Sequence, residues 1–532
     1  MRFFLAVLVA LSLLLPLPAP AADQSDLMKK IEDLSRQLDA LKQQMQEMKQ
    51  KETTKDERIA KVEKKTQEAT KPSWLQIGGD YRGRFDYLKG TTHDWYSFQQ
   101  VLPYFLQMPG AQLPQLIPSQ DFKNDALMTN RFGINLLAKA TEDVTVKARL
   151  LMYKVWGHES VEPVAGPSTA FFADKFFVFD GNVSHIPQDN ILRVDQAYAT
   201  WSNIAGAPLW FSVGRRPSTG GVPTNLRQNV EKSGSAGVPG LLIDYAFDGG
   251  TIGFAPDIQA LPGAYAKVCY GKGFDSGFRT SGTANSLNDV NFLGINVVPY
   301  DTDTFRVELQ WDRAFGIFAF PENRNGSSLG FGPNTNLGDI DQFGLTVMGK
   351  IEKLGPGDLN LFADGAISKT HPNDNMFSVM TPGGAMPVAG LLYDAPNFGG
   401  VKESKTGQAL YLGARYDFTK TGTKLGLEYN YGSKNWIAFA PASDDMWTSK
   451  LGAHGSVYEA YIIQEIKSKP LSRMGKAQFR LGYQYYSFKY TGSNNWVGAP
   501  KSMSDLNNPM NAQMFPPLKK ANDIYLTFDV TF

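Results

Sequence analysis

The last ten residues of the chain are Asp523-Ile524-Tyr525-Leu526-Thr527-Phe528-Asp529-Val530-Thr531-Phe532. Apolar residues alternate with more polar ones along this stretch, so an extended strand would have one apolar face and one polar face. In water such a strand needs a protein core against its apolar face. In a bilayer the lipid covers that face, provided that every backbone group pairs within a closed barrel. The stretch alone is compatible with the edge of a soluble β-sandwich and with a membrane barrel.

The N-terminus predicts export. Arg2 precedes an apolar run at 3–15, and a stretch rich in Pro and Ala follows up to Ala22. We expect residues 1–22 to be a cleavable secretory signal peptide. No apolar stretch of about 18 residues or more occurs after it, which excludes an inner-membrane helical protein. The net charge of +1 argues against a nucleic-acid partner.

Residues 23–71 predict a coiled-coil helix. Apolar side chains recur at alternating spacings of four and three residues: Leu27, Ile31, Leu34, Leu38, Leu41, Met45 and Met48. This heptad seam continues with a partly charged core until Pro72 ends the helix. The simplest partners for the seam are copies of the same chain, and a dimer and a trimer are both compatible with it. The helix could also hold the barrel at a distance from a periplasmic or cell-wall partner.

A different period begins after Pro72. From Leu75 to Tyr87 the odd-numbered residues are apolar or glycine, and the even-numbered residues are mostly charged. A strand of this length, tilted by about 45°, spans roughly 30 Å of bilayer. Trp74 and Tyr87 would then lie at the two membrane interfaces.

The same alternation returns through residues 72–532 in pairs of strands joined by short turns. We expect hairpins that pair 132–138 with 144–152, 191–201 with 208–216, 239–247 with 251–271, 290–299 with 305–312, 340–352 with 359–369, 408–418 with 424–432, and 456–466 with 476–490. Long polar stretches lie between them: 88–127, 157–189, 217–238, 272–288, 315–338, 370–406, 433–455 and 491–521. Short turns that alternate with long loops are typical of outer-membrane barrels.

The fold class that these patterns predict is all-β. We expect a transmembrane antiparallel β-barrel of about 16 strands, because the first and last strands add to the hairpins, with an N-terminal periplasmic coiled-coil helix. The first strand, 75–87, and the last strand, which ends at Phe532, should be hydrogen-bonded neighbours. Both chain ends then lie on the side of the short turns, in the periplasm, and lipid of the outer membrane surrounds the wall.

The inward-facing residues of such a barrel are charged and of both signs. The candidate pore-lining residues are Arg82, Arg84, Arg131, Lys147, Arg149, Arg306, Glu308, Arg415 and Arg480. The first five form the densest basic group and the best candidate for a functional patch. A mixed lumen predicts at most a weak preference for anions, because strong selectivity requires a ring or ladder of one sign. The long segment from His93 to Phe122 could fold inward as a plug or lie over the outer mouth.

Features of enzymes are weak in this chain. The five histidines fall in predicted loops, and none has the spacing of a metal-ligand motif: His93, His158, His185, His371 and His454. His158 with Glu159 and Ser160 is the nearest approach to a catalytic set. Cys269 is the single cysteine, so no internal disulfide or haem-attachment motif is present. We expect no enzymatic activity and no cofactor.

Three features of the chain resemble known porin-like proteins: the exported coiled coil, the opening Ile77-Gly78-Gly79-Asp80-Tyr81-Arg82-Gly83-Arg84-Phe85-Asp86, and the terminal Phe532. Together they are similar to a family of large coiled-coil porins of unassigned function from Gram-negative bacteria. The architecture is also similar to the phosphate-selective porins, which are trimeric channels with an N-terminal coiled coil. Those porins have a ladder of inward Arg and Lys, whereas this lumen is mixed, so the resemblance does not imply phosphate selectivity.

The function that we predict is an outer-membrane, porin-like channel for the passive diffusion of small hydrophilic solutes or ions. The first alternative is a barrel that acts as a scaffold or sheath for an exported partner such as a cytochrome. The second alternative is an outer-membrane enzyme.

Overall fold

The computed structural model describes residues 32, 74–157, 187, 189–279, 286–319, 335–441, 444–472 and 474–532. The predicted signal peptide (1–22) and coiled coil (23–71) lie outside these ranges except for Glu32, so both stay predictions. Residues Trp74–Phe532 form one compact unit. Among the described residues, no helix is both long enough and apolar enough to cross a membrane.

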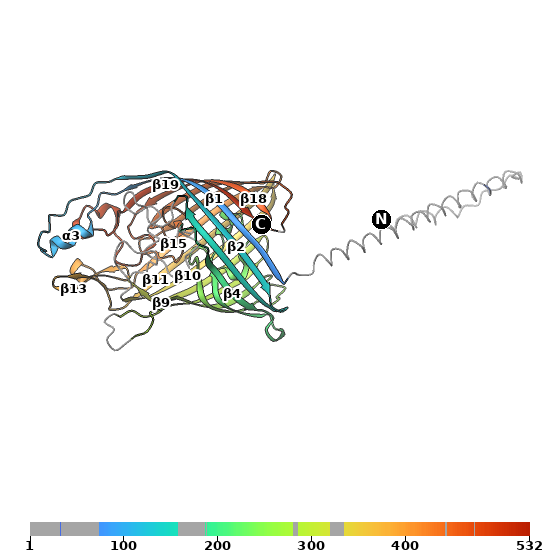
Figure 1. Ribbon diagram of the computed structural model, residues 1–532, viewed down its shortest axis with the longest axis horizontal. Coiled ribbons are helices and arrows are strands. Elements are labelled where there is room, and N and C mark those ends of the chain that lie inside the picture. The colour runs from blue at the N-terminus through green and yellow to red at the C-terminus, as the bar shows by residue number, and fades with distance from the viewer. Residues whose placement is uncertain are drawn as a thin grey trace, which may run out of the picture. The chain divides into compact units, whose positions relative to one another are not determined.

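Sixteen strands close into one barrel (Figure 1). They are β1 (Leu75–Thr92), β2 (Asp121–Lys139), β3 (Val144–Val155), β4 (Arg193–Trp201), β5 (Leu209–Ser218), β6 (Tyr245–Phe254), β7 (Tyr265–Phe274), β8 (Val290–Asp301), β9 (Phe305–Phe318), β10 (Asn336–Leu354), β11 (Gly357–Pro372), β15 (Thr406–Phe418), β16 (Thr423–Gly432), β17 (Gly455–Glu465), β18 (Lys476–Phe488) and β19 (Leu518–Thr531). Neighbouring strands are antiparallel. The predicted fold class and strand number are confirmed.

The other elements within the described residues lie in the connections. They are the helices α3 (Phe98–Phe105) and α5 (Thr224–Gln228), the short strands β12 (Phe377–Thr381), β13 (Gly384–Gly390) and β14 (Tyr393–Asp394), and the 3₁₀ segments η1 (Ile204–Gly206), η2 (Gly234–Ala236), η3 (Pro396–Phe398), η4 (Lys450–Gly452), η5 (Met503–Asp505) and η6 (Pro509–Asn511). One end of the barrel, the long-loop end, carries α3 and β13, and the other, the short-turn end, carries the C-terminus (Figure 1).

The first and last strands close the barrel. β1 pairs with β19 in a register that sets Phe85 against Leu526 and Arg82 against Asp529. The backbone N–H of Gly79 donates to the carbonyl of Phe532 at 2.8 Å, and the N–H of Phe532 donates back at 3.0 Å. The predicted pairing of these strands is therefore confirmed, and the closed ladder leaves no free sheet edge.

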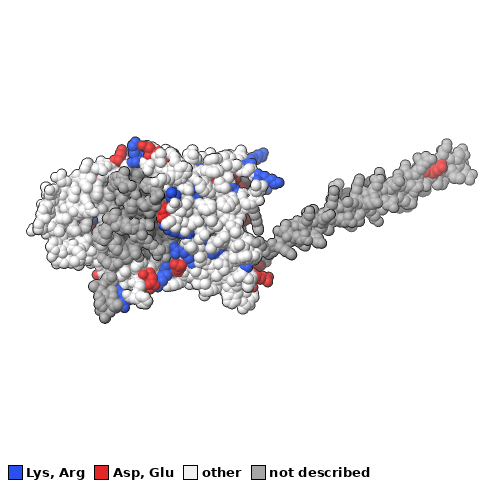
Figure 2. Space-filling model, in the orientation of Figure 1, with Lys and Arg blue, Asp and Glu red and all other residues white. Residues whose placement is uncertain are grey.

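The two faces of the wall differ as the sequence alternation predicts. On the outer face Ile77, Leu427 and Ile252 expose 69%, 66% and 59% of their surface, whereas Asp523 and Thr527, on the inner face of β19, are fully buried. Uncharged residues make up most of the barrel surface on the side drawn in Figure 2. Such an extensive exposed apolar face is typical of a surface that lipid covers.

One predicted hairpin is wrong in its boundaries. The sequence suggested a turn at Asp248-Gly249-Gly250, but these residues lie within β6, and the turn is at 255–264. Gly249 faces Gly271 of β7 so closely that a Cβ on it would lie 2.0 Å from the carbonyl oxygen of Tyr270. The glycine therefore permits a close approach of two strands rather than a turn. Residues 239–244, which we assigned to a strand, belong instead to a loop.

Candidate functional site in the barrel lumen

Two of the long loops enter the barrel. They are the 219–244 loop, which contains α5, and the 433–454 loop. Leu226, Arg227, Asp445 and Lys450 are each at most 6% exposed, and their partners are inward-facing residues of several strands. The interior of the barrel is consequently occupied by side chains of these two loops.

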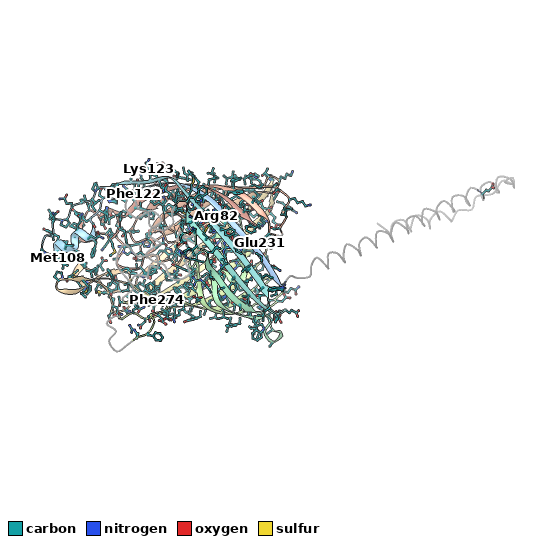
Figure 3. The ribbon with its side chains drawn as sticks, viewed as in Figure 1. Arg82, Met108, Phe122, Lys123, Glu231 and Phe274 are labelled. Carbon is teal, nitrogen blue, oxygen red and sulfur yellow. The ribbon has the colours of Figure 1, made fainter. Side chains whose placement is uncertain are left out.

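The 219–244 loop extends to the short-turn end. Arg415 of β15 donates to the carbonyl of Leu226 at 2.5 Å, and Lys424, at the start of β16, donates to the side-chain oxygen of Asn229 at 2.6 Å. Farther along the loop, Lys232 reaches the turn between β8 and β9, where its ammonium lies 2.5 Å from Asp301 and 2.8 Å from the carbonyl of Thr302. In Figure 3 the neighbouring Glu231 lies closer than Arg82 to the short-turn end. The loop thus passes through the lumen.

The segment from His93 to Phe122 does not provide this plug. Its helix α3 lies at the long-loop end (Figure 1), where Phe98 packs against Phe398 with ring centroids 6.2 Å apart. Trp95 forms a β-bridge with Ile117 that closes the loop on itself. Of the two arrangements that the sequence left open, the structure has the loop over the mouth.

Asp444 of the 433–454 loop is the centre of a cluster of arginines. Its carboxylate forms an ion pair with Arg82, lies 3.7 Å from Arg131 and 3.4 Å from Arg480, and its carbonyl accepts from Arg84 at 2.7 Å. Burial alone would raise the pKa of Asp444, but the positive charges of these arginines hold that pKa well below its usual value. The carboxylate is therefore ionised at any physiological pH.

The loops also carry positive charge to an acidic part of the wall. The guanidinium of Arg227 lies 2.7 Å from Asp445 and 3.1 Å from Glu459 of β17. The ammonium of Lys450 lies 2.5 Å from Glu459 and pairs with Glu428 of β16. The Arg227–Asp445 contact joins the two inward loops to each other. We call the contacts of Asp444, Asp445, Arg227 and Lys450 the lumen network.

The predicted pore-lining residues divide into two groups. Six of them are at most 7% exposed: Arg82, Arg84, Arg306, Glu308, Arg415 and Arg480. Each has a charged neighbour; for example, Arg84 pairs with Asp86 at 2.6 Å and Arg306 with Glu308 at 2.8 Å. The carboxylates that face the basic group compensate its charge, so no uncompensated ladder of one sign results.

The other three predicted residues are more accessible. Arg131 and Arg149 keep 19% and 18% of their side chains exposed, and Arg149 pairs with Asp80 at 2.6 Å. Lys147 lies two residues before Arg149 on β3, so both side chains are on the inner face of the strand. Lys147 is exposed and has no ion pair within the described part of the chain. Arg131 pairs directly with Arg82 across β1 and β2. Lys147 and Arg149 lie nearer the short turn between β2 and β3.

Two of the described histidines, His371 and His454, make contacts with other residues of the protein. His371 is not in a loop as expected but near the end of β11, with its ring 2.8 Å from Asp341. His454 is fully buried, with one ring nitrogen 2.8 Å from the carbonyl of Thr491 and the other 2.7 Å from that of Trp436. It ties the 433–454 loop to the 489–517 loop. His158, with Glu159 and Ser160, and His185 lie outside the described residues. Within those residues, no group of three or more acidic, His or Cys side chains is arranged to hold a metal ion.

The buried position of His454 predicts an effect of pH. Burial lowers its pKa below the ordinary 6.5, although the two carbonyls partly oppose this. An unfolded loop binds the proton more readily than the folded one, so the stabilisation is complete above pH 6.5 and is lost as pH falls through the lowered pKa. We expect limited proteolysis of the 433–454 and 489–517 loops to be faster at acidic pH than at pH 7.5. In a His454→Gln variant this dependence should weaken, and in a His93→Gln control it should persist; equal rates at both pH values in the wild type would contradict the expectation.

The model of one protein family matches residues 121–532, and its description is "Protein of unknown function (DUF3373)". The chain belongs to this family. No curated protein matches the chain.

Several solved outer-membrane proteins resemble this DUF3373 barrel. OprB of Pseudomonas putida is 11% identical, with 86% of this chain and 94% of that chain covered and a TM-score of 0.39. The outer-membrane channel DcaP of Acinetobacter baumannii is 11% identical, with 86% and 97% covered and a TM-score of 0.37. A trimer form of OmpT of Vibrio cholerae is 11% identical, with 86% and 99% covered and a TM-score of 0.37. At this level of similarity we transfer no property of those proteins to this chain.

The sequence did not reveal the loop residues of the lumen network. Asp444, Asp445, Arg227 and Lys450 fall in stretches that looked polar, and nothing in their spacing connects them to β1, β17 or β18. One signal was present: both loops contain apolar runs, Ile437-Ala438-Phe439-Ala440 in one and Leu241-Leu242-Ile243 in the other. Apolar runs are unusual in loops that face water, and in this DUF3373 barrel both runs are buried.

Proposed function

We propose that the protein is an outer-membrane channel for the passive diffusion of small hydrophilic solutes or ions, narrowed by its two inward loops. The main support for this proposal is that the barrel is closed and has an apolar outer face and a charged inner face. In this proposal the long loops face the outside, and both the short turns and Phe532 face the periplasm. Lipid covers the outer face and water enters the lumen.

The inward loops limit the size of what passes. The lumen between the arginines around Asp444 and the contact of Arg227 with Glu459 holds buried side chains of the two loops. In this proposal solutes cross between the loops and the wall, and we expect a unitary conductance below that of an unobstructed barrel of this size. Three candidate pore-lining residues remain accessible: Arg131 lies level with Arg82, and Lys147 and Arg149 lie nearer the short-turn end.

The proposal is tested by solute release from liposomes that contain the purified full chain. Small neutral sugars and amino acids should leave at a rate proportional to protein content, and solutes of increasing size should leave progressively more slowly. Release no faster than from empty liposomes for all solutes would contradict the channel.

The filled lumen also favours a second candidate, a closed barrel that is a scaffold or sheath for an exported partner such as a cytochrome. In that case the same liposomes stay tight, and a haem protein co-purifies with the barrel from native membranes. An active channel without such a partner excludes this candidate.

We further propose that the coiled coil at 23–71 assembles the protein into a homodimer or homotrimer. Deleting residues 23–71 while keeping the signal peptide should convert the oligomer into monomers, as measured by light scattering with the detergent contribution subtracted. The barrel itself should still form, because its ladder closes without that segment. An oligomer whose mass falls only by the deleted residues would show that the barrels associate by themselves, and a periplasmic or cell-wall contact would then be the remaining role of the helix.

A further inference from the structure

A cavity lies at the long-loop end of the barrel, separate from the lumen network. Its walls come from the 93–120, 373–405, 433–454 and 489–517 loops and the adjoining strand ends, and its volume is about 260 Å³. Met108 in Figure 3 marks this end of the molecule.

The walls of the cavity are mostly apolar and aromatic. The principal lining residues are Phe98 and Val101 of α3, Phe398, Trp447, Phe488 and Met503. Val101, Trp447, Phe488 and Met503 are at most 8% exposed. The indole of Trp447 is fixed by a 2.8 Å hydrogen bond to the carbonyl of Asn522. The sequence of α3, FQQVLPYF, contains no charged residue.

The charged groups and several other polar groups at the cavity have partners within the protein. Lys501 forms an ion pair with Asp394, whose carboxylate also accepts from the backbone N–H of Ala499 at 2.9 Å. The hydroxyl of Thr491 accepts from the N–H of Lys501 at 3.0 Å, and the carboxamide of Asn495 accepts from the N–H of Val497 at 2.8 Å. A charged ligand would therefore enter without a counterion, because the single cation here is neutralised by Asp394.

We infer that this cavity is a binding site for an uncharged, mostly apolar small molecule. An engineered apolar cavity of about 150 Å³ is known to hold benzene, so the larger space here accommodates two fused aromatic rings or a hydrocarbon chain of comparable size. Aromatic walls favour a planar ring system, since offset and edge-to-face contacts add to the burial of apolar area. The site goes beyond the proposed channel function and does not depend on it.

The test uses naphthalene as the probe and the full chain in lipid nanodiscs, so that detergent does not compete. We expect saturable binding of one naphthalene per chain after subtraction of binding to empty nanodiscs. Val101→Trp should weaken this binding by about tenfold or more, because the indole fills the space, and Val388→Phe is a second variant in case the first does not fold. Leu113→Trp is the matched control: Leu113 is in the same loop as Val101 but is 67% exposed and does not line the cavity.

A charged analogue, naphthalene-2-sulfonate, should bind much more weakly than naphthalene. The inference is overturned if naphthalene shows no saturable binding above that of empty nanodiscs, or if folded Val101→Trp and Val388→Phe both bind as the wild type does. Equal binding of the sulfonate would also overturn the assignment to an uncharged ligand. If the barrel shows no channel activity but still binds naphthalene, the channel proposal is wrong and the binding-site proposal stands. The two proposals can therefore be tested independently.

Discussion

Replacing the 219–244 loop by a short turn is expected to raise the single-channel conductance several-fold. The ends of the loop permit this change, because Ser218 of β5 and Tyr245 of β6 are directly paired in the barrel wall. A variant in which a glycine-containing turn joins them keeps the closed ladder and removes α5, Arg227 and Lys232 from the lumen. The measurement is the size of the current steps in a planar bilayer.

The experiment needs a control variant and an assay of barrel folding. Trimming residues 108–114 in the loop over the mouth is the matched control, since those residues do not contact the lumen network, and the wild-type conductance should be retained. Heat-modifiable migration on a gel shows whether each variant forms a barrel. Wild-type conductance from a correctly folded loop-replaced barrel would contradict the assignment of the 219–244 loop as a constriction.

Substitution of Asp444 is expected to change both stability and ion preference. In Asp444→Asn the arginines Arg82, Arg131 and Arg480 lose a buried counterion, which costs about 3–5 kcal/mol when one partner of a buried pair is removed. The uncompensated positive charge should make the lumen prefer anions. The reversal potential in a salt gradient should therefore move toward the anion equilibrium value.

Arg227→Gln is the matched substitution of opposite sign. It leaves Asp445 and Glu459 without their guanidinium, so the reversal potential should move toward the cation equilibrium value. Asp374→Asn is a control, because the side chain of Asp374 is 93% exposed and its ion pair with Lys402 is at the surface, where such pairs contribute little. Shifts of the same sign in Asp444→Asn and Arg227→Gln would contradict the lumen network as the determinant of selectivity.

The wall of the barrel could be read from the sequence, and its contents could not. Alternation at Leu75–Thr92 and Leu518–Thr531 is a local property of each strand, and it specifies which side chains face lipid and which face inward. The same alternation predicts that Arg82, Arg84 and Arg480 face inward. The hairpin at Asp248-Gly249-Gly250 was wrong because glycine serves both tight turns and close strand contacts.

The lumen network depends on contacts between residues that are far apart in the chain. Asp444 meets Arg82 across 362 positions, and Arg227 meets Glu459 across 232. No periodicity encodes such a meeting, because an irregular loop has no repeating relation between position and direction. The apolar runs at 241–243, which we assigned to a strand, and at 437–440 are the features of the sequence that are consistent with the burial of these segments.

The charges of the wall are largely compensated, which predicts weak selectivity in the wild type and strong selectivity once a member of the network is removed. This contrast separates a compensated lumen from a dedicated anion pore, in which the wild type itself would be selective.

Single-channel recording of the full wild-type chain in a planar bilayer tests whether the barrel is a channel that its inward loops narrow. We predict discrete, small current steps with a reversal potential near zero in a salt gradient. Bilayers that contain many inserted, correctly folded barrels and yet show no current steps would contradict it.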